Sequence, residues 1–290
     1  FSSSTQYNTT SATSSGAFYM DIYDKAPTDS TAEVQFAIAY GNRFGSGSLD
    51  FTNEEGSKGF SAAKSIYNQY KNIVFGGDET TNFSFDGHVP DGIYVININR
   101  ARYKNALRLG NLDFKLKKGS TTLELTDDSA TTSGSANAIR AGVGREFNLV
   151  SGSGGIRLGT TTTFVTDSGS YGYVYPDAGF IILNQDALDA ATGDGGINLS
   201  TTITTNNNGK NPVKLQDALS DGDKFILDAQ EDIASKFYFI RVKNTEFNYT
   251  TNDSFTEDDG TLKFDSMVDN PQTYITTVGL YNDNQDLLAV

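Results

Sequence analysis

The sequence predicts a fold class between mainly β and α+β, with antiparallel strands and hairpins, one clear amphipathic helix, short helices and long polar loops. Gly, Ser, Thr and Asn make up 111 of the 290 residues, a composition typical of turns and β-structure. Short runs of alternating apolar and polar residues recur along the chain, which is the period of a half-buried strand. These two features favour strands over helices for most of the chain.

The first hundred residues contain four expected strands. They are residues 17–23, 32–40, 82–86 and 93–98. In the second of them, Val34, Phe36 and Ile38 share one face. Residues 93–98 (IYVINI) begin apolar on both faces, which indicates a central strand of a sheet.

One helix is expected at about residues 60–75. Its apolar positions repeat at a spacing of three and four residues, and they are Phe60, Ala63, Tyr67, Tyr70 and Val74. This spacing places them on one helical face, and Gly76–Gly77 ends the helix. Aromatic residues at this spacing are usually buried, so Tyr67 and Tyr70 are interpreted as core residues rather than as a binding platform.

Three hairpins are expected from paired alternating runs on either side of a turn. They pair 112–117 with 122–126, 171–175 with 180–183, and 274–281 with 287–290. The apolar end Leu287–Val290 is therefore either a hairpin strand or an edge strand that pairs with another chain. Because the sequence starts at Phe1 and stops on this run, it is expected to be a segment of a longer chain or to be cut at its ordered ends.

The other elements are expected to be short. They are strands at 147–150, 155–158 and 236–242, a helix at 186–191, and one or two helical turns at 213–219. Polar loops are expected at 127–138, 159–170 (a mobile one), 192–211 and 251–260 (an acidic one).

The domain prediction places a flexible lead or linker at residues 1–16. A β-rich N-terminal domain with one helix follows at 17–126, and a β-rich C-terminal domain covers 139–290. The boundary lies near the polar stretch 127–138, and a single domain is the alternative.

Charge and composition exclude several classes of function. The 22 basic and 36 acidic residues give a net charge of −14, which argues against direct binding to nucleic acid or to an anionic membrane. No apolar run approaches the ~20 residues of a membrane span. The chain has no Cys and a single His, which excludes disulfides, thiolate metal sites, a catalytic Cys and any mechanism that needs two histidines.

The sequence predicts no catalytic, cofactor-binding or metal-binding residue, and no cofactor. The single imidazole, His88, is interpreted as an ordinary loop residue. Three acidic clusters could offer oxygen ligands to Ca²⁺, and they are Asp127–Asp128, Asp221 with Asp223, and Glu257–Asp259. None has the spacing of an EF-hand loop, so solvated loops are the preferred interpretation.

Three groups of segments carry a family resemblance. They are 65–72 with 93–104, 173–184, and 237–248 with 271–282. In these segments the chain resembles virion structural proteins of marine T4-like myophages, especially cyanophages. The resemblance implies a structural role in the particle, in the contractile tail or its baseplate, and it implies no catalytic residues.

The sequence therefore predicts a non-enzymatic virion component, a multi-copy scaffold in the tail or baseplate of a phage and made in the host bacterial cytoplasm. Its expected partners are other virion proteins and further copies of itself, with no direct nucleic acid, no membrane span, and contact with the host surface left open. A neck or capsid location is an alternative. A second hypothesis is a host-surface adhesin that binds glycan through loops bearing Tyr171, Tyr173 and Tyr175, and a third is a glycan-degrading enzyme with paired Asp and Glu residues.

Overall fold

The protein is described by a computed structural model. The described residues are 2–3, 19–47, 62–78, 80–158, 165–166, 169–203, 211–243, 246, 249–269, 272 and 274–290. The chain divides into residues 1–232 (unit 1) and residues 233–290 (unit 2), and each is described by itself. The predicted fold class is confirmed, because 32% of the chain is strand and 17% is helix. No helix within the described ranges is long and apolar enough to cross a membrane.

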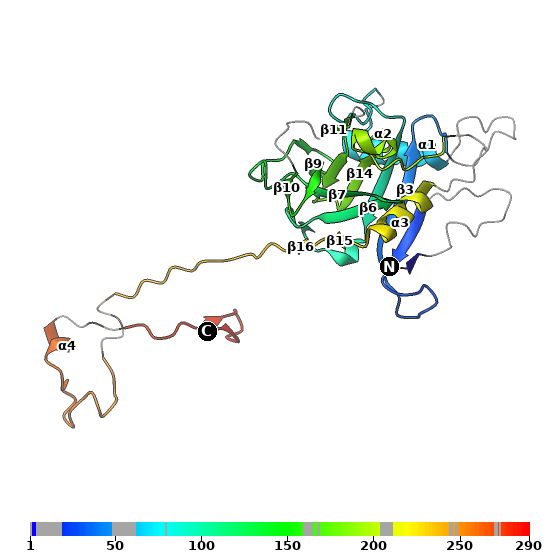
Figure 1. Ribbon diagram of the computed structural model, residues 1–290. Coiled ribbons are helices and arrows are strands. Elements are labelled where there is room, and N and C mark those ends of the chain that lie inside the picture. Colours follow the sequence, from blue (N-terminus) through cyan, green and yellow to red (C-terminus); the bar gives the residue numbers. More distant parts are fainter. Residues whose placement is uncertain are drawn as a thin grey trace. The chain divides into compact units, whose positions relative to one another are not determined.

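Unit 1 is built on one large antiparallel sheet (Figure 1). Its strand order is β1 (Ser2–Ser3), β2 (Tyr19–Tyr23), β3 (Val34–Asn42), β4 (Gly92–Ile98), β14 (Phe180–Asn184), β13 (Gly172–Tyr175), β9 (Gly144–Ser153), β7 (Thr121–Asp127), β6 (Asp113–Lys118) and β15 (Phe225–Ile226). Two short strands, β8 (Ala138–Arg140) and β10 (Ile156–Arg157), also pair with β9.

Two further pairs of short strands complete the β-structure of unit 1. They are β5 (Ala106–Leu107) with β16 (Ala229–Gln230), and β11 (Val165–Thr166) with β12 (Gly169–Ser170).

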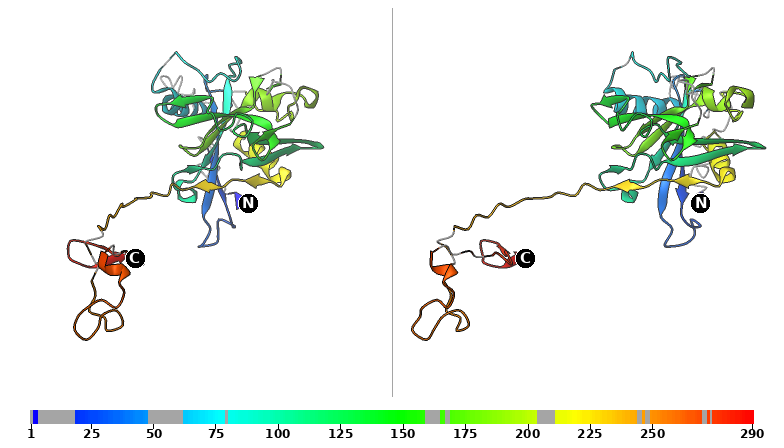
Figure 2. Two further views of the ribbon diagram at one scale, coloured as in Figure 1. Left: turned by 90° about the vertical axis from the view of Figure 1, so that its left-hand side faces the viewer. Right: turned by 60° about the vertical axis from the view of Figure 1, so that its left-hand side comes forward.

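The large sheet curls so that strands far apart in its order approach each other (Figure 2). Phe36 of β3 stacks on Phe225 of β15, with ring centroids 4.8 Å apart. Helix α3 (Asn211–Gly222) packs against both β6 and β3, and it buries Leu215, Ala218 and Leu219 in the core that the curl encloses. Aromatic stacking and one helix therefore join the two sides of the curl.

Strand β4 is central, as its two-sided apolar pattern predicts. It pairs with β3 on one edge and with β14 on the other. Tyr94 and Ile96 belong to the core inside the curl, whereas Ile93 and Val95 belong to a second core on the opposite face. Both faces of the strand are buried because the two cores lie on either side of it.

The predicted helix is confirmed as α1 (Ala62–Phe75), which covers this second core (Figure 1). Tyr67 and Tyr70 are buried, as expected, and Tyr67 meets Phe83 edge to face at 5.5 Å. After Phe75, Gly76 and Gly77 adopt φ values of 69° and 85°, a left-handed conformation in which Gly ends helices. Phe60 lies outside the described residues.

Two of the expected hairpins occur in unit 1 with the predicted pairing. In β6–β7, Phe114 lies opposite Leu125, and Leu116 opposite Leu123. In β13–β14, Tyr175 lies opposite Phe180. The strand expected at 82–86 is wrong. Asp86 and Gly87 take positive φ values and turn the chain back at once, which leaves a single bridge between Phe85 and His88.

The remaining helices are short, apart from α3. Helix α2 (Gln185–Asp189) corresponds to the helix predicted at 186–191, and α3 is longer than the one or two turns predicted at 213–219. Two 3₁₀ turns lie at Arg100–Arg102 and Thr192–Asp194. The predicted flexible lead lies almost wholly outside the described residues, as does most of the loop at 159–170.

The observed division of the chain differs from the predicted boundary near 127–138. Strands β7 and β9 lie on either side of that stretch and pair through Leu125–Asp127 and Leu149–Ser151. The two sides therefore share one sheet, and the division falls after Asp232 instead. A polar loop between two paired strands resembles a linker in composition, which is why the sequence suggested a boundary there.

Unit 2 contains little regular structure in its described part. Helix α4 is Ser266–Asp269, and β17 (Leu280–Tyr281) pairs with β18 (Leu287–Ala289). The hairpin predicted from 274–281 and 287–290 is therefore much shorter than expected, because residues 274–279 form no strand. It gives Leu287–Ala289 a partner within the chain. The strand predicted at 236–242 is wrong for the chain as described, because these residues pair with no other strand there.

Candidate interaction surface

His88 is placed against a carboxylate. Its Nε2 lies 2.8 Å from Oδ2 of Asp186, in the first turn of α2. The contact ties the tight turn at 85–88 to that helix. Within the described ranges, no group of three His, Cys, Asp or Glu side chains is arranged to hold a metal ion. The contact accounts for His88 as a structural residue.

The acidic pair Asp127–Asp128 is buried, so the preferred interpretation of a solvated loop is wrong for this pair. Asp127 accepts hydrogen bonds from the backbone N–H groups of Gly110 and Ser129, and Asp128 accepts from the backbone and side chain of Asn148. Burial raises the pKa of Asp128. The hydrogen bonds replace the lost water and fix the loops. The other two clusters are exposed, as expected.

The three tyrosines proposed to stack on glycans do not lie on exposed loops. Tyr171, Tyr173 and Tyr175 are all buried, the last two in β13. Their hydroxyls donate to Gly195 O, Ser84 O and Glu146 Oε2, respectively. This placement was wrong because alternating aromatic residues can face either of two cores, and the curled sheet provides both.

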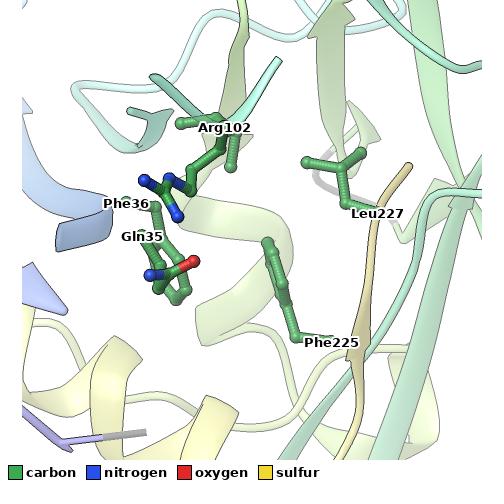
Figure 3. A pocket seen from close by; sticks show the side chains of 6 residues that line it. Gln35, Phe36, Arg102, Phe225 and Leu227 are labelled. Carbon is green, nitrogen blue, oxygen red and sulfur yellow. The ribbon is translucent and has the colours of Figure 1, made fainter. Parts of the chain in front are cut away.

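Unit 1 has a small pocket where the two sides of the curl meet (Figure 3). Phe36, Phe225, Leu227 and Arg102 line an open space of about 160 Å³. Arg102 lies on the side of Phe36, and Leu227 on the side of Phe225 (Figure 3). Arg102 is held at the rim by an ion pair with Glu33, at 2.7 Å. The lining is mostly ring and aliphatic carbon, so the pocket offers little chemistry beyond accepting an apolar side chain.

Unit 2 exposes many large apolar side chains to solvent. Its described part has no buried hydrophobic side chain, and Thr256 is its only buried residue there. By contrast, Phe237 is 84% exposed, Phe239 98% and Tyr274 85%. Large aromatic side chains contribute most to stability when they are buried, so this degree of exposure marks an interaction surface.

Residues 233–243 carry several of these exposed side chains on a stretch of extended chain, and we call them the aromatic segment (Figure 1). In extended chain, Tyr238, Ile240 and Val242 lie on one face, and Phe237 and Phe239 on the other. Within the part of the chain that the structure describes, the N–H groups of 233–242 make no backbone hydrogen bond. Backbone groups and both side-chain faces are therefore open to a partner strand.

One face of the aromatic segment borders a groove. Ile240 and Val242 line one side, and residues 274–278 line the other, around an open volume of about 350 Å³. Tyr274, Ile275 and Val278 supply its apolar surface. The opposite face, which carries Phe237 and Phe239, has no such neighbour within the described residues.

Charges in unit 2 are segregated along the chain. The aromatic segment carries Lys236, Arg241 and Lys243 and no acidic residue, whereas 251–260 carries four acidic residues and no basic one. Among the described residues of unit 2, no Lys or Arg forms an ion pair with a carboxylate. Both sets of charges are free for an intermolecular contact.

The comparisons identify no relative from which a site could be transferred. No protein-family model, curated protein or solved structure gives a significant match to this chain.

The interaction surface was only partly foreseen from the sequence. The alternation in 236–242 predicted a strand, without indicating a partner for it. Two features could have pointed to an external partner. The run is apolar on both faces, and the only expected strands after it, 274–281 and 287–290, are paired with each other.

Proposed function

We propose that this protein is a non-enzymatic structural component of a tailed-phage virion, a multi-copy scaffold of the contractile tail or baseplate that acts through protein–protein interfaces. The observation that carries the proposal is the exposed apolar surface of unit 2, combined with the absence of buried hydrophobic side chains from its described part. The resemblance of 237–248 and 271–282 to virion proteins falls on this same unit.

The physical argument concerns the size and burial of unit 2. A segment of this size that buries no hydrophobic side chain in its described part needs a partner, a metal or disulfides to become stable. The chain has no Cys, and the described residues hold no metal cluster. Burial against another protein surface is the remaining source of stability, and the neighbouring subunits of a permanent assembly would supply it.

Unit 1 supports the proposal in a different way. Its sheet is continuous, both faces carry a hydrophobic core, and several of its ionic groups are paired within the unit. In this proposal, unit 1 is a rigid domain, and unit 2 supplies the contacts for assembly. The proposed partners are other virion proteins and further copies of the same chain, and the proposed location is the virion, with the neck or capsid as the alternative to the tail.

The glycan-binding hypothesis gains no support from the described residues, because the three tyrosines that motivated it are buried and hydrogen-bonded.

The experiment that tests the proposal is quantitative mass spectrometry of purified virions, combined with antibody labelling in the electron microscope. We expect the protein at a copy number that is a multiple of three or six, with label at the tail end. Label at the neck or head would change the location, and absence from the particle would overturn the proposal.

A further inference from the structure

We infer that the aromatic segment pairs with the same segment of a second copy of this chain, as two antiparallel strands about a two-fold axis at Phe239. The inference rests on the proposed function, because it names the contact through which copies of the scaffold join. The occupant of the exposed surface is then a second unit 2 rather than an unrelated protein.

The backbone and side chains of the segment meet the requirements of an added strand. The N–H groups of 233–242 have no backbone partner among the described residues, and main-chain hydrogen bonds supply the affinity when a strand is added to an open edge. Ile240 and Val242 line the groove. In an extended chain Tyr238 shares their face, and Phe237 and Phe239 lie on the other. A paired second strand doubles both apolar faces and brings the aromatic residues of the two copies within reach of each other.

The positions of the cations determine the direction of pairing. A parallel in-register arrangement places Lys236, Arg241 and Lys243 beside their own copies, and like charges side by side are destabilising. An antiparallel pair centred on Phe239 places Lys236 opposite Val242, Arg241 opposite Phe237, and Lys243 opposite Ser235. Each cation then faces an uncharged residue, and Arg241 can lie over an aromatic ring.

The register is constrained by the same charges. Slipping the antiparallel pair by one residue places Lys236 opposite either Arg241 or Lys243. The register centred on Phe239 avoids both contacts and pairs the whole of 236–242. It also gives an isologous contact, in which each copy uses the same surface.

Charge complementarity explains why the partner is a second copy. The aromatic segment is locally basic in a chain whose net charge is −14. The acidic stretch of unit 2 contains Asp253, Glu257, Asp258 and Asp259, and no Lys or Arg among the described residues pairs with it. A second unit 2 therefore brings the carboxylates that the cations of the first lack, and the reverse holds equally.

The absence of Cys from the chain permits a direct test by disulfide trapping. In the full-length protein, Phe239→Cys places one thiol opposite itself across the axis, within the 4.4–6.8 Å Cα separation of a disulfide. In the same pairing, two copies of Ile233→Cys lie about 40 Å apart. The third variant, Ile139→Cys, is a control on the exposed surface of unit 1.

We expect Phe239→Cys to form a covalent dimer under mild oxidation at least about tenfold faster than either control, because pairing raises the effective thiol concentration. Since this substitution removes a ring, the double variant Tyr238→Cys/Ile240→Cys provides a second test with Phe239 intact. In the proposed register, its two thiols lie opposite each other. Equal rates for Phe239→Cys and Ile233→Cys would indicate a parallel in-register pair and overturn the register. Rates no faster than that of Ile139→Cys would overturn the pairing.

A charge exchange tests the choice of a second copy. We expect Lys236→Glu/Arg241→Glu/Lys243→Glu to weaken self-association at least about tenfold, and Asp253→Lys/Glu257→Lys/Asp258→Lys to do the same. Mixing the two variants should restore a dimer that contains one of each, as measured by analytical ultracentrifugation. Failure of the mixture to associate would contradict charge complementarity between copies. The protein could instead stay monomeric at all concentrations while the amides of 236–242 are protected from exchange. That result would show that unit 1 of the same chain covers the aromatic segment, and it would overturn the inference.

These outcomes are separable from those that test the proposed function. Presence in virions without trapping at Phe239 would reject this inference and leave the structural role standing. Trapping at Phe239 in a protein absent from virions would reject the structural role and leave the pairing standing.

Discussion

Strand β4 and the aromatic segment have the same kind of sequence and opposite environments. The first reads IYVINI at 93–98 and the second FYFIRV at 237–242, and both carry apolar side chains on both faces. In β4, Ile93, Tyr94, Val95 and Ile96 are fully buried. In the aromatic segment, Phe239 is almost fully exposed. A strand with apolar residues on both faces therefore favours burial of both faces. Its sequence does not show which segment, or which chain, buries them.

The difference lies in what surrounds each strand. β4 has a hydrogen-bonded strand on each edge and a hydrophobic core on each face. The aromatic segment has one groove on one face and no strand on either edge within the described chain. Charges follow the same division. Arg140 pairs with Glu146 and Arg145 with Asp177 inside unit 1, whereas the described cations of unit 2 pair with no carboxylate.

The largest effect expected from this comparison is a cavity in the core of unit 1. Ile96→Ala should lower the free energy of unfolding by about 2–5 kcal/mol, because Ile96 is fully buried between two neighbouring strands. The matched change in the aromatic segment, Ile240→Ala, should cost less than about 0.5 kcal/mol in dilute solution. Urea denaturation followed by tyrosine fluorescence measures both, since the chain has no Trp. Equal losses would show that the aromatic segment is already buried in the monomer.

The next effect concerns the buried carboxylate of unit 1. Glu146 accepts hydrogen bonds from Arg140, Asn137 and the Tyr175 hydroxyl. Glu146→Gln puts an NH₂ group among these donors, so we expect a loss of about 1–3 kcal/mol in the free energy of unfolding. The exposed control Glu257→Gln in unit 2 should change it by less than about 0.5 kcal/mol. A neutral outcome for both would mean that the network around Glu146 is rebuilt with water.

A smaller, pH-dependent effect comes from Asp177. The side chain and backbone N–H of Arg145 donate to this carboxylate and hold the pKa of Asp177 below its ordinary value of about 3.9. The ionised form is favoured in the folded state, so its stabilising effect is full above about pH 4 and is lost as the pH falls through the lowered pKa.

The variants Asp177→Asn and Arg145→Gln measure this effect. Each should cost about 1 kcal/mol in the free energy of unfolding at pH 6, a modest amount because both side chains are about one-third exposed. The difference from the unsubstituted protein should shrink as the pH is lowered below about 4. Urea titrations at a series of pH values follow it, and a loss that does not vary with pH would assign the effect to packing rather than to charge.

The smallest effect is expected in the hairpin of unit 2. The Asn282 side-chain oxygen accepts hydrogen bonds from the N–H groups of Asn284 and Asp286, which fixes the turn between β17 and β18. Asn282→Ala should destabilise the hairpin by about 0.5 kcal/mol. Faster amide exchange at 287–289, with unit 1 unchanged, would show this, and Asn284→Ala in the same turn is the control. Slower exchange in unit 1 or no change at 287–289 would contradict this assignment.

Much of unit 1 could be predicted because its signals are local. The 3-4-3-4 spacing defined α1, and the alternation around Gly119 and Pro176 defined the two hairpins. The strand predicted at 82–86 failed because Phe83 and Phe85 serve the aromatic core without forming a backbone ladder. The buried state of Asp127 and Asp128 could not be predicted, since it depends on N–H donors from Gly110 and Asn148, which lie far away in the sequence.

The sequence by itself determined the fold class, the position of α1, the central place of β4 and the lack of thiol chemistry. These follow from periodicity and composition, which act over a few residues. Only the tertiary structure decided that one sheet spans the predicted boundary, that Tyr171, Tyr173 and Tyr175 are buried, and that 236–242 has no partner strand in the described chain. The physical reason is that burial depends on contacts between segments that are far apart in the sequence. A local pattern of apolar residues shows only that they favour burial, and not which segment buries them.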